Sequence, residues 1–296
     1  MPSGSIVAGA LAPHPPHLVY AANPPQNEPR AECGWENLRW GYERMARDLE
    51  ALKPDVIVVL SPHWQTYIGT HFLGVPAFKS LSVDPIFPNL FRYHYDLQVD
   101  VPLAEGICAA AKERGLVTSM MRNPDFRVDY GTIISCHLAR PAWDLPVVSI
   151  SSCRSTAFYN VDVMQEQALA LGRATRQAIE ASGKRALLLA SNSLSHRHFT
   201  EESDVPEDMS REHIYNHHQY LWDMRVIDQM KRGRTREIWE QMPEFVEQAV
   251  SEADSGALSW LLAAMDFPDY PAEVYAYGTV IGTGNVVASW TPGGAV

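Results

Sequence analysis

Three stretches decide the fold: residues 6–14 read IVAGALAPH, residues 56–63 read VIVVLSPH, and residues 186–196 read ALLLASNSLSH. Each stretch begins as a short apolar run of the kind that forms a buried strand, and each ends in a polar loop that contains a histidine. The carboxyl ends of neighbouring parallel strands converge in the crevice where open α/β sheets bind ligands. We therefore expect the three histidines to meet in one site.

Strand-like and helix-like segments alternate along the rest of the chain. Helical patterns cover 35–52, 101–114 and 164–182, and further strands are expected over 145–152 and 275–290. This alternation predicts an α/β fold with helices on both faces of one sheet. We expect residues 1–296 to form a single domain of this kind.

The composition excludes several classes of protein. The formal net charge is −11 at pH 7, whereas a nucleic-acid surface needs a basic stripe. The four cysteines form no CxxC pair, so we expect no zinc knuckle and no disulfide framework, but reduced thiols in a cytoplasmic protein. The apolar run at 6–12 has no basic region before it and is followed by prolines, which argues against a signal peptide and against a membrane span.

His14 and His63 are the strongest candidates for metal ligands. Prolines on both sides of His14 fix the backbone, so its imidazole has little conformational freedom left to lose, and Pro62 precedes His63 in the same way. Such stiffness suits a metal ligand. The alternative for either histidine is a capped turn. His217 and His218 are expected on a solvated helix face.

A third, anionic ligand would complete a 2-His-1-carboxylate site, which leaves positions open for substrate and dioxygen on ferrous iron. An apolar stripe runs from Ile238 to Ala249 at helical spacing and next reaches Glu252. A carboxylate buried there needs a cation or hydrogen-bond donors. The alternative is a helix that ends near Gly256 and leaves Glu252 in water. Spacing alone leaves three other acids open as ligands: Asp84, Asp129 and Glu212.

Several ordered motifs resemble those of the class III extradiol ring-cleaving dioxygenases. They are APHPPH at 12–17, SPHW at 61–64, DYGT at 129–132 and SNSLSH at 191–196. The likeness extends over nearly the whole chain and includes NPPQNEP at 23–29, SVDPIFPN at 82–89 and YGTVIGTGN at 277–285. It is strongest toward the branch of the family that cleaves aminophenols.

The resemblance implies a non-haem Fe(II) site at the carboxyl ends of the strands, with His14, His63 and Glu252 as ligands. It implies His196 as the acid/base residue, which suits an imidazole whose unperturbed pKa is about 6.5. It also implies that Tyr130 lies near the substrate. The activity implied is cleavage of 2-aminophenol or a substituted aminophenol by dioxygen, which gives an aminomuconic semialdehyde-type product.

The resemblance also implies assembly, because the aminophenol enzymes pair a catalytic subunit with a related, non-catalytic one. We therefore expect a homo-oligomer or a hetero-oligomer. Residues 80–98 contain Pro85, Pro88 and four aromatic residues and are expected to form a long loop that packs against such a partner.

Two other functions stay open at this point. One is extradiol cleavage of a catechol, and the other is an interaction protein that resembles the Memo-type proteins or the non-catalytic subunit. The presence of His14, His63, Glu252 and His196 together favours an enzyme. The glycine-rich stretch 278–284 lacks the GxGxxG spacing of a nucleotide-binding loop, so we expect a bent strand there.

Overall fold

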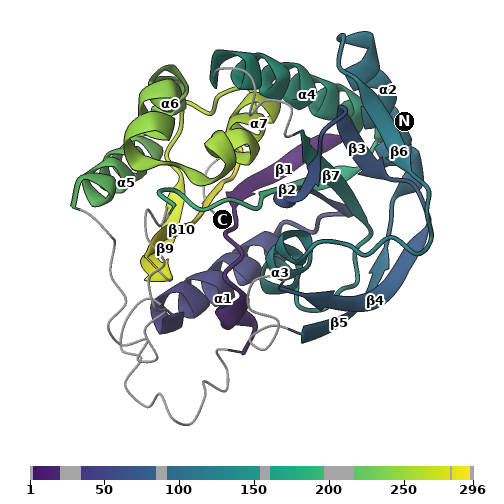
Figure 1. Ribbon diagram of the computed structural model, residues 1–296, viewed down its shortest axis with the longest axis horizontal. Helices are drawn as coiled ribbons and strands as arrows, with labels where there is room; N and C mark the ends of the chain where they lie inside the picture. The colour runs from purple at the N-terminus through teal and green to yellow at the C-terminus, as the bar shows by residue number, and fades with distance from the viewer. Residues whose placement is uncertain are drawn as a thin grey trace.

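Buried apolar runs form the centre of a mixed sheet in the computed structural model (Figure 1). The structure describes residues 3–20, 35–84, 92–153, 161–196, 217–280 and 282–293. Within these ranges eight strands make up the sheet, in the order β6-β3-β7-β2-β8-β1-β10-β9. Their bounds are β1 (Ser5–Leu11), β2 (Val56–Thr66), β3 (Thr70–Leu73), β6 (Thr118–Met121), β7 (Val147–Cys153), β8 (Arg185–Ala190), β9 (Glu273–Val280) and β10 (Thr283–Trp290).

The four central strands β1, β8, β2 and β7 run parallel to one another. The last two described strands, β9 and β10, close one edge of the sheet with antiparallel pairing. The prediction of one bent strand over residues 278–284 is wrong, because β9 ends at Val280 and β10 begins at Thr283. Because β1, β8 and β2 are neighbours, their carboxyl ends lie side by side. The three histidine-bearing segments therefore leave the sheet at one edge.

Strand β8 shows why these runs are apolar almost throughout. Ala186, Leu188 and Ala190 pack into the core on one face of the sheet, whereas Leu187 and Leu189 pack into the core on the other. Successive side chains of a strand point to opposite faces. A strand covered on both faces therefore needs apolar residues at every position.

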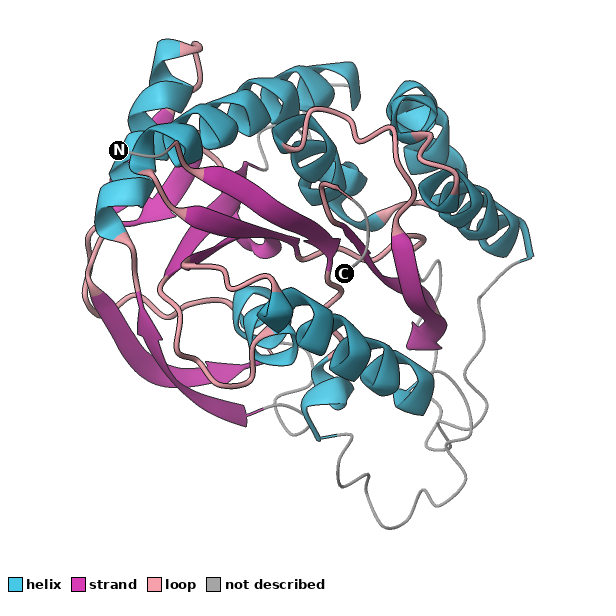
Figure 2. Ribbon diagram, turned by 180° about the vertical axis from the view of Figure 1, so that it is seen from behind, coloured by secondary structure: helices cyan, strands magenta, loops and turns pink. Residues whose placement is uncertain are grey.

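Helices cover both faces of the sheet, as expected (Figure 2). One face carries α2 (Val101–Glu113), α4 (Val161–Ser182), α5 (His217–Lys231), α6 (Thr235–Ala249) and α7 (Gly256–Ala264). The other face carries η1 (Pro16–Tyr20), α1 (Trp35–Ala51), α3 (Tyr130–Ala139) and a hairpin of β4 (Ala77–Val83) and β5 (Arg92–Gln98).

Strand β2 continues beyond Leu60, where the apolar pattern predicts its end. Its ladder with β7 skips from Ser61 to Gln65, so the three residues between them bulge out of the sheet. Pro62 in this bulge has no N–H to offer to a ladder. A bulge re-aims a side chain without ending the strand, and here the side chain is that of His63.

The expectation of a loop over residues 80–98 is wrong at both ends. Strands β4 and β5 pair in antiparallel register over their whole described length, with Val83 opposite Arg92. In β5 the side chains of Tyr95 and Leu97 are buried in the core while their neighbours are more exposed. The alternation of a half-buried strand decides the structure here. Pro85 and Pro88 lie outside the described residues.

Among the described helices, none is both long enough and apolar enough to cross a membrane.

Candidate metal centre

The loop that carries His14 leaves the end of β1 and is held by two side chains from the helices beneath the sheet. The hydroxyl of Tyr42 on α1 donates a hydrogen bond to the carbonyl of Pro13. The hydroxyl of Ser135 on α3 donates to the carbonyl of Ala12 at 2.6 Å. These bonds and the flanking prolines fix the backbone at His14, whose side chain is buried.

Ser191, just after β8, faces Nδ1 of His14. Its Oγ lies 2.9 Å from this nitrogen and also donates to the carbonyl of Gly131 at 3.1 Å. With its proton on that carbonyl, the hydroxyl accepts a hydrogen bond from Nδ1–H. Nε2 is then the nitrogen that would bind a metal.

His63 is positioned through Asp129, the N-cap residue of α3. The Asp129 carboxylate accepts hydrogen bonds from the backbone N–H of Thr132 at 2.9 Å and from the Ser61 hydroxyl at 2.5 Å. Ser61 Oγ in turn accepts a bond from the backbone N–H of His63 at 3.2 Å. One carboxylate thus caps α3 and, through Ser61, holds the bulge of β2 in place.

Glu252 is buried, but not as the next turn of a continuous helix. Residues Ile238, Met242, Phe245 and Ala249 form the buried stripe of α6, as expected. The helix then ends, because Val250 adopts a left-handed conformation with φ of 49°. Glu252 opens the short turn η4 (Glu252–Ser255), in which Ala253, Asp254 and Ser255 also have positive φ.

The two oxygens of Glu252 have different partners. Oε2 accepts hydrogen bonds from the backbone N–H of Ser193 at 2.6 Å, from its hydroxyl at 2.9 Å and from the side-chain amide of Asn192 at 3.3 Å. Oε1 lies 3.1 Å from Nε2 of His14 and 3.4 Å from Nε2 of His63. The carboxylate is therefore anchored through one oxygen and presents the other to the imidazoles.

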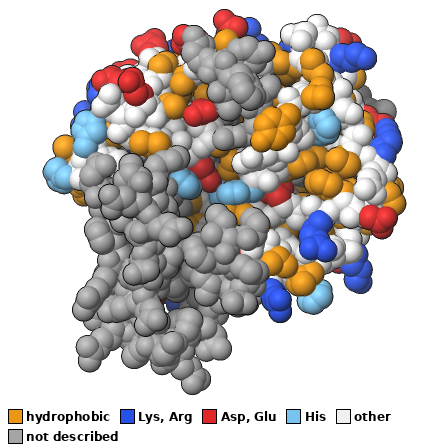
Figure 3. Space-filling model, in the orientation of Figure 1, with side chains coloured by type: hydrophobic (Ala, Val, Ile, Leu, Met, Phe, Trp, Pro, Cys, Tyr) orange, Lys and Arg blue, Asp and Glu red, His pale blue; other side chains and the backbone are white. Residues whose placement is uncertain are grey.

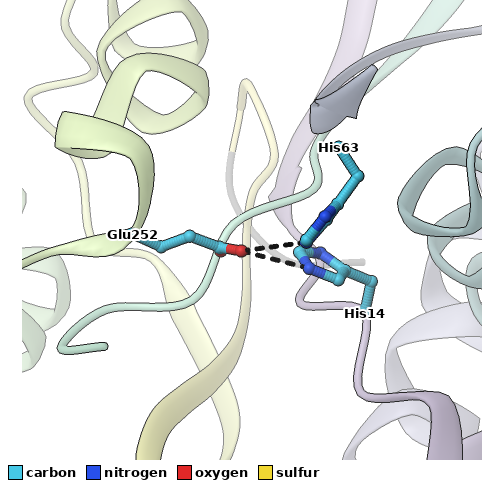
Figure 4. A group of neighbouring side chains, drawn as sticks. All are labelled: His14, His63 and Glu252. Carbon is cyan, nitrogen blue, oxygen red and sulfur yellow. Dashed lines mark ion pairs between the residues drawn. The ribbon is translucent and has the colours of Figure 1, made fainter. Parts of the chain in front are cut away.

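The structure brings His14, His63 and Glu252 together (Figure 4). Their donor atoms all lie within 4.8 Å of one another, and the two imidazole rings meet edge to face at 4.5 Å between centroids. Burial by itself raises the pKa of the Glu252 carboxyl, but the neighbouring histidines hold this pKa well below its usual range. The residue is therefore an anion that faces two nitrogen donors, a combination that suits a divalent cation.

Tyr130 is the first residue of α3, and its hydroxyl lies 2.9 Å from Nε2 of His63. Burial, together with the carboxylates of Asp84, Glu252 and Asp129, raises the pKa of this hydroxyl well above its usual value. Tyr130 therefore keeps its proton at neutral pH and acts as a hydrogen-bond donor at the edge of the cluster.

His196 lies on a short segment that pairs with the segment of Glu252. The backbone N–H of His196 donates to the carbonyl of Val250 at 3.1 Å, and the N–H of Glu252 donates to the carbonyl of Leu194 at 3.2 Å. Ser195 and Ser251 form the antiparallel bridge between these two bonds. The half-buried His196 is thus fixed, through the backbone, to the residue that follows α6.

A family model described as the catalytic LigB subunit of aromatic ring-opening dioxygenase matches residues 8–288. The chain belongs to the LigB family. It is therefore a ring-cleaving dioxygenase, an oxidoreductase.

Two relatives of this LigB chain are named as subunits of 2-aminophenol 1,6-dioxygenase. The chain is 54% identical to the 2-aminophenol 1,6-dioxygenase beta subunit of a Pseudomonas species, over 98% of this chain and 95% of the relative. It is 25% identical to the alpha subunit of that name, over 87% and 91% of the two chains. An uncharacterized protein of Escherichia coli K12 shares the fold, with a TM-score of 0.60 at 14% identity over 96% and 99% of the chains.

Among the described residues, the other acids and histidines considered as metal ligands are not part of the cluster of His14, His63 and Glu252. Asp129 uses its carboxylate to cap α3, and Asp84 is buried at the end of β4, whereas Glu212 lies outside the described residues. His217 and His218 are exposed on α5, as predicted. On the face shown in Figure 3, histidine and acidic side chains meet near the centre of the view, next to hydrophobic side chains.

Sequence reasoning missed the residues that hold the cluster from behind. Ser191 and Ser193 contact His14 and Glu252, yet in the sequence they are simply two serines near a histidine. The available signal was their place directly after a buried strand, where polar side chains face the site of an α/β fold. Asp223, a fully buried acid on α5, was also missed.

Proposed function

We propose that residues 1–296 form one catalytic domain that cleaves 2-aminophenol, or a substituted aminophenol, with Fe(II) and dioxygen. Both oxygen atoms enter the product, an aminomuconic semialdehyde-type compound. The observation that carries this proposal is the buried cluster of His14, His63 and Glu252 in a chain 54% identical to a beta subunit named for 2-aminophenol 1,6-dioxygenase.

The three side chains fit a ferrous ion. Two imidazoles and one carboxylate, all on one side, are the arrangement that non-haem Fe(II) oxygenases use, and it leaves positions for two further ligands. Glu252 contributes Oε1, because its Oε2 is already occupied by Ser193 and Asn192. His14 contributes Nε2, because its Nδ1 faces Ser191. When bound, the iron supplies a path for electrons between the aromatic ring and dioxygen.

His196 is the residue we assign to proton transfer. Its imidazole can accept the proton that the substrate hydroxyl loses on binding and can return it to an oxygen atom later in the reaction. Its segment pairs with that of Glu252, which supports a place next to the substrate. Tyr130 keeps its proton and donates a hydrogen bond to the substrate or to dioxygen from beside His63.

We also propose a hetero-oligomer with a related, non-catalytic chain. The relatives at 54% and 25% identity are named as the beta and alpha subunits of one dioxygenase. Similarity to the beta subunit is much the greater of the two. This chain would therefore be the catalytic member of such a pair.

The cytoplasm is the location we propose. The described cysteines Cys108, Cys136 and Cys153 are all free thiols. Reduced thiols are the usual state of cysteine in that compartment.

A matched pair of substrates tests the reaction. After anaerobic reconstitution with Fe(II), we expect kcat/KM under air to be higher for 2-aminophenol than for catechol, because an aminophenol binds with a neutral nitrogen and this chain is 54% identical to the beta subunit of an aminophenol enzyme. Spectral assays of ring opening measure both. A preference for catechol of about tenfold, equivalent to roughly 1.4 kcal/mol, would replace the aminophenol assignment with the catechol alternative.

Ser191→Ala should weaken metal binding while leaving all three ligands in place. The variant removes the acceptor that holds Nδ1–H of His14, and loss of such a supporting bond typically costs about 10- to 100-fold in metal affinity. Competition with a chelator measures the affinity. Ser259→Ala is the control, because Ser259 is equally buried and its hydroxyl has no hydrogen-bond partner among the described residues. Equal affinities in the two variants would remove Ser191 from the site.

A further inference from the structure

Asp223 is a fully buried carboxylate that the proposed reaction does not use. Its Oδ1 accepts a hydrogen bond from the backbone N–H of Ser195 at 2.9 Å. Its Oδ2 accepts bonds from the hydroxyls of Ser195 and Tyr277, each at 2.7 Å. Burial raises the pKa of the Asp223 carboxyl to about 6, and these hydrogen bonds oppose that rise. At neutral pH the group is therefore mainly an anion that accepts three bonds.

Gly284 of β10 is shaped to this carboxylate. A Cβ atom on Gly284 would lie 1.9 Å from Oδ2 of Asp223 and 2.8 Å from Oγ of Ser195. Gly284 also exchanges two backbone hydrogen bonds with the same segment, from the N–H of Leu194 at 2.8 Å and to the carbonyl of Ser195 at 2.9 Å. The last glycine of the 278–284 stretch is therefore a close-approach position, not part of a nucleotide loop.

Ser195 is thus held on three sides: by Asp223, by Gly284, and by its bridge to Ser251. The next residue is His196, whose backbone carbonyl also accepts a bond from the Gln219 side chain of α5 at 3.2 Å. Helix α5 therefore fixes the backbone before and at His196. Small errors in the placement of an acid/base group can cost a large factor in rate.

We propose that Asp223 is a positioning residue that, with Gly284 and Tyr277, clamps Ser195 and so sets the orientation of His196 toward the substrate. This inference rests on the acid/base role proposed for His196. The clamp shares a backbone pairing with the segment of Glu252, but among the described contacts none of its side chains bonds to the Glu252 carboxylate, which is anchored through Ser193 and Asn192. It should therefore act on proton transfer and leave metal binding intact.

Asp223→Ala tests the clamp in the iron-loaded enzyme. We expect kcat to fall by about 10- to 100-fold, while KM and iron content stay unchanged. Asp223→Asn should restore most of kcat, since its amide oxygen still accepts from the Ser195 N–H and its NH₂ can donate to the two hydroxyls. Asp228→Ala is the matched control, because Asp228 is an exposed acid of the same helix that pairs only with Arg232 among the described contacts.

A double-mutant cycle gives a sharper test. Gly284→Ala inserts a methyl group against the Asp223 carboxylate and should lower kcat on its own. In the double variant with Asp223→Ala, the oxygen at 1.9 Å is gone and the Ser195 hydroxyl, at 2.8 Å, is free to turn away, so the second substitution should add little to the first. Independent effects that simply add, as for residues that do not share a contact, would overturn the proposal.

Amide hydrogen exchange tests the clamp by a measurement that does not depend on enzyme activity. In Asp223→Ala, the Ser195 and His196 amides should exchange on the order of tenfold faster, as loss of bonds to a charged acceptor implies, while the amides of β1 stay protected. Unchanged exchange would refute the clamp whatever the activity. If the wild-type enzyme turns over no aminophenol but exchange still responds, the proposed substrate fails and the clamp stands.

Discussion

Alanine at His14, His63 or Glu252 should abolish turnover and leave the purified protein with little iron. Each substitution removes one of three donors that lie within 4.8 Å of one another, and two remaining donors form a much weaker site. Elemental analysis after anaerobic reconstitution measures the metal, and ring opening measures the activity. Full iron occupancy in all three variants would contradict the ligand assignment.

Glu252→Gln separates loss of the ligand from loss of the fold. In Glu252→Ala the buried donors of Ser193 and Asn192 lose their acceptor, and each unsatisfied group costs about 1–3 kcal/mol of stability. The glutamine keeps an oxygen for these donors but removes the charge that attracts the cation. It should therefore lose iron with a smaller fall in the free energy of unfolding.

His217→Ala is the control for the three alanine variants. His217 is exposed on α5, so this substitution should change neither iron content nor activity.

His196→Ala should keep its iron and still bind the substrate, but lose most of its activity. A general acid/base group typically contributes about 10²- to 10⁴-fold, and His196 is not part of the cluster of three donors among the described residues. Iron content, substrate-induced spectral change and kcat are measured on the same preparation.

The result distinguishes two roles for this imidazole. Loss of iron in His196→Ala would make the residue a ligand rather than an acid/base group. Normal activity would remove it from the reaction. His71→Ala is a suitable control, because the His71 ring contacts the carbonyl of Ile68 and lies outside the cluster of three donors.

Much of this architecture could be predicted from the sequence, because it depends on local patterns. Buried parallel strands must be apolar on both faces, so β1, β2 and β8 are visible as uninterrupted runs. The rule that such strands place their following loops at one edge then brings His14 and His63 together. The burial of Glu252 could also be anticipated, from the stripe of α6.

The parts that could not be predicted depend on contacts between distant residues. The left-handed turn after Ala249 involves residues other than glycine and has no local signature. The bulge at His63 is fixed by Asp129, more than sixty residues later in the chain. The partners of Asp223 come from three separate segments. The buried residues of α5 also include Gln219 and Gln229, so the sequence does not mark Asp223 as a single polar residue on an apolar face.

The position of β1 in the sheet has a consequence for synthesis of the protein. This strand is made before the other described strands, yet its two neighbours are β8 and β10, which lie in the last two-fifths of residues 1–296. At roughly 5–20 residues per second, the ribosome needs more than about ten seconds to deliver β10 after β1. During that time the nascent β1 segment has neither of the strands with which it pairs in the folded sheet. The catalytic centre is therefore assembled only after β8 and Glu252 have been synthesised, although His14 is made long before them.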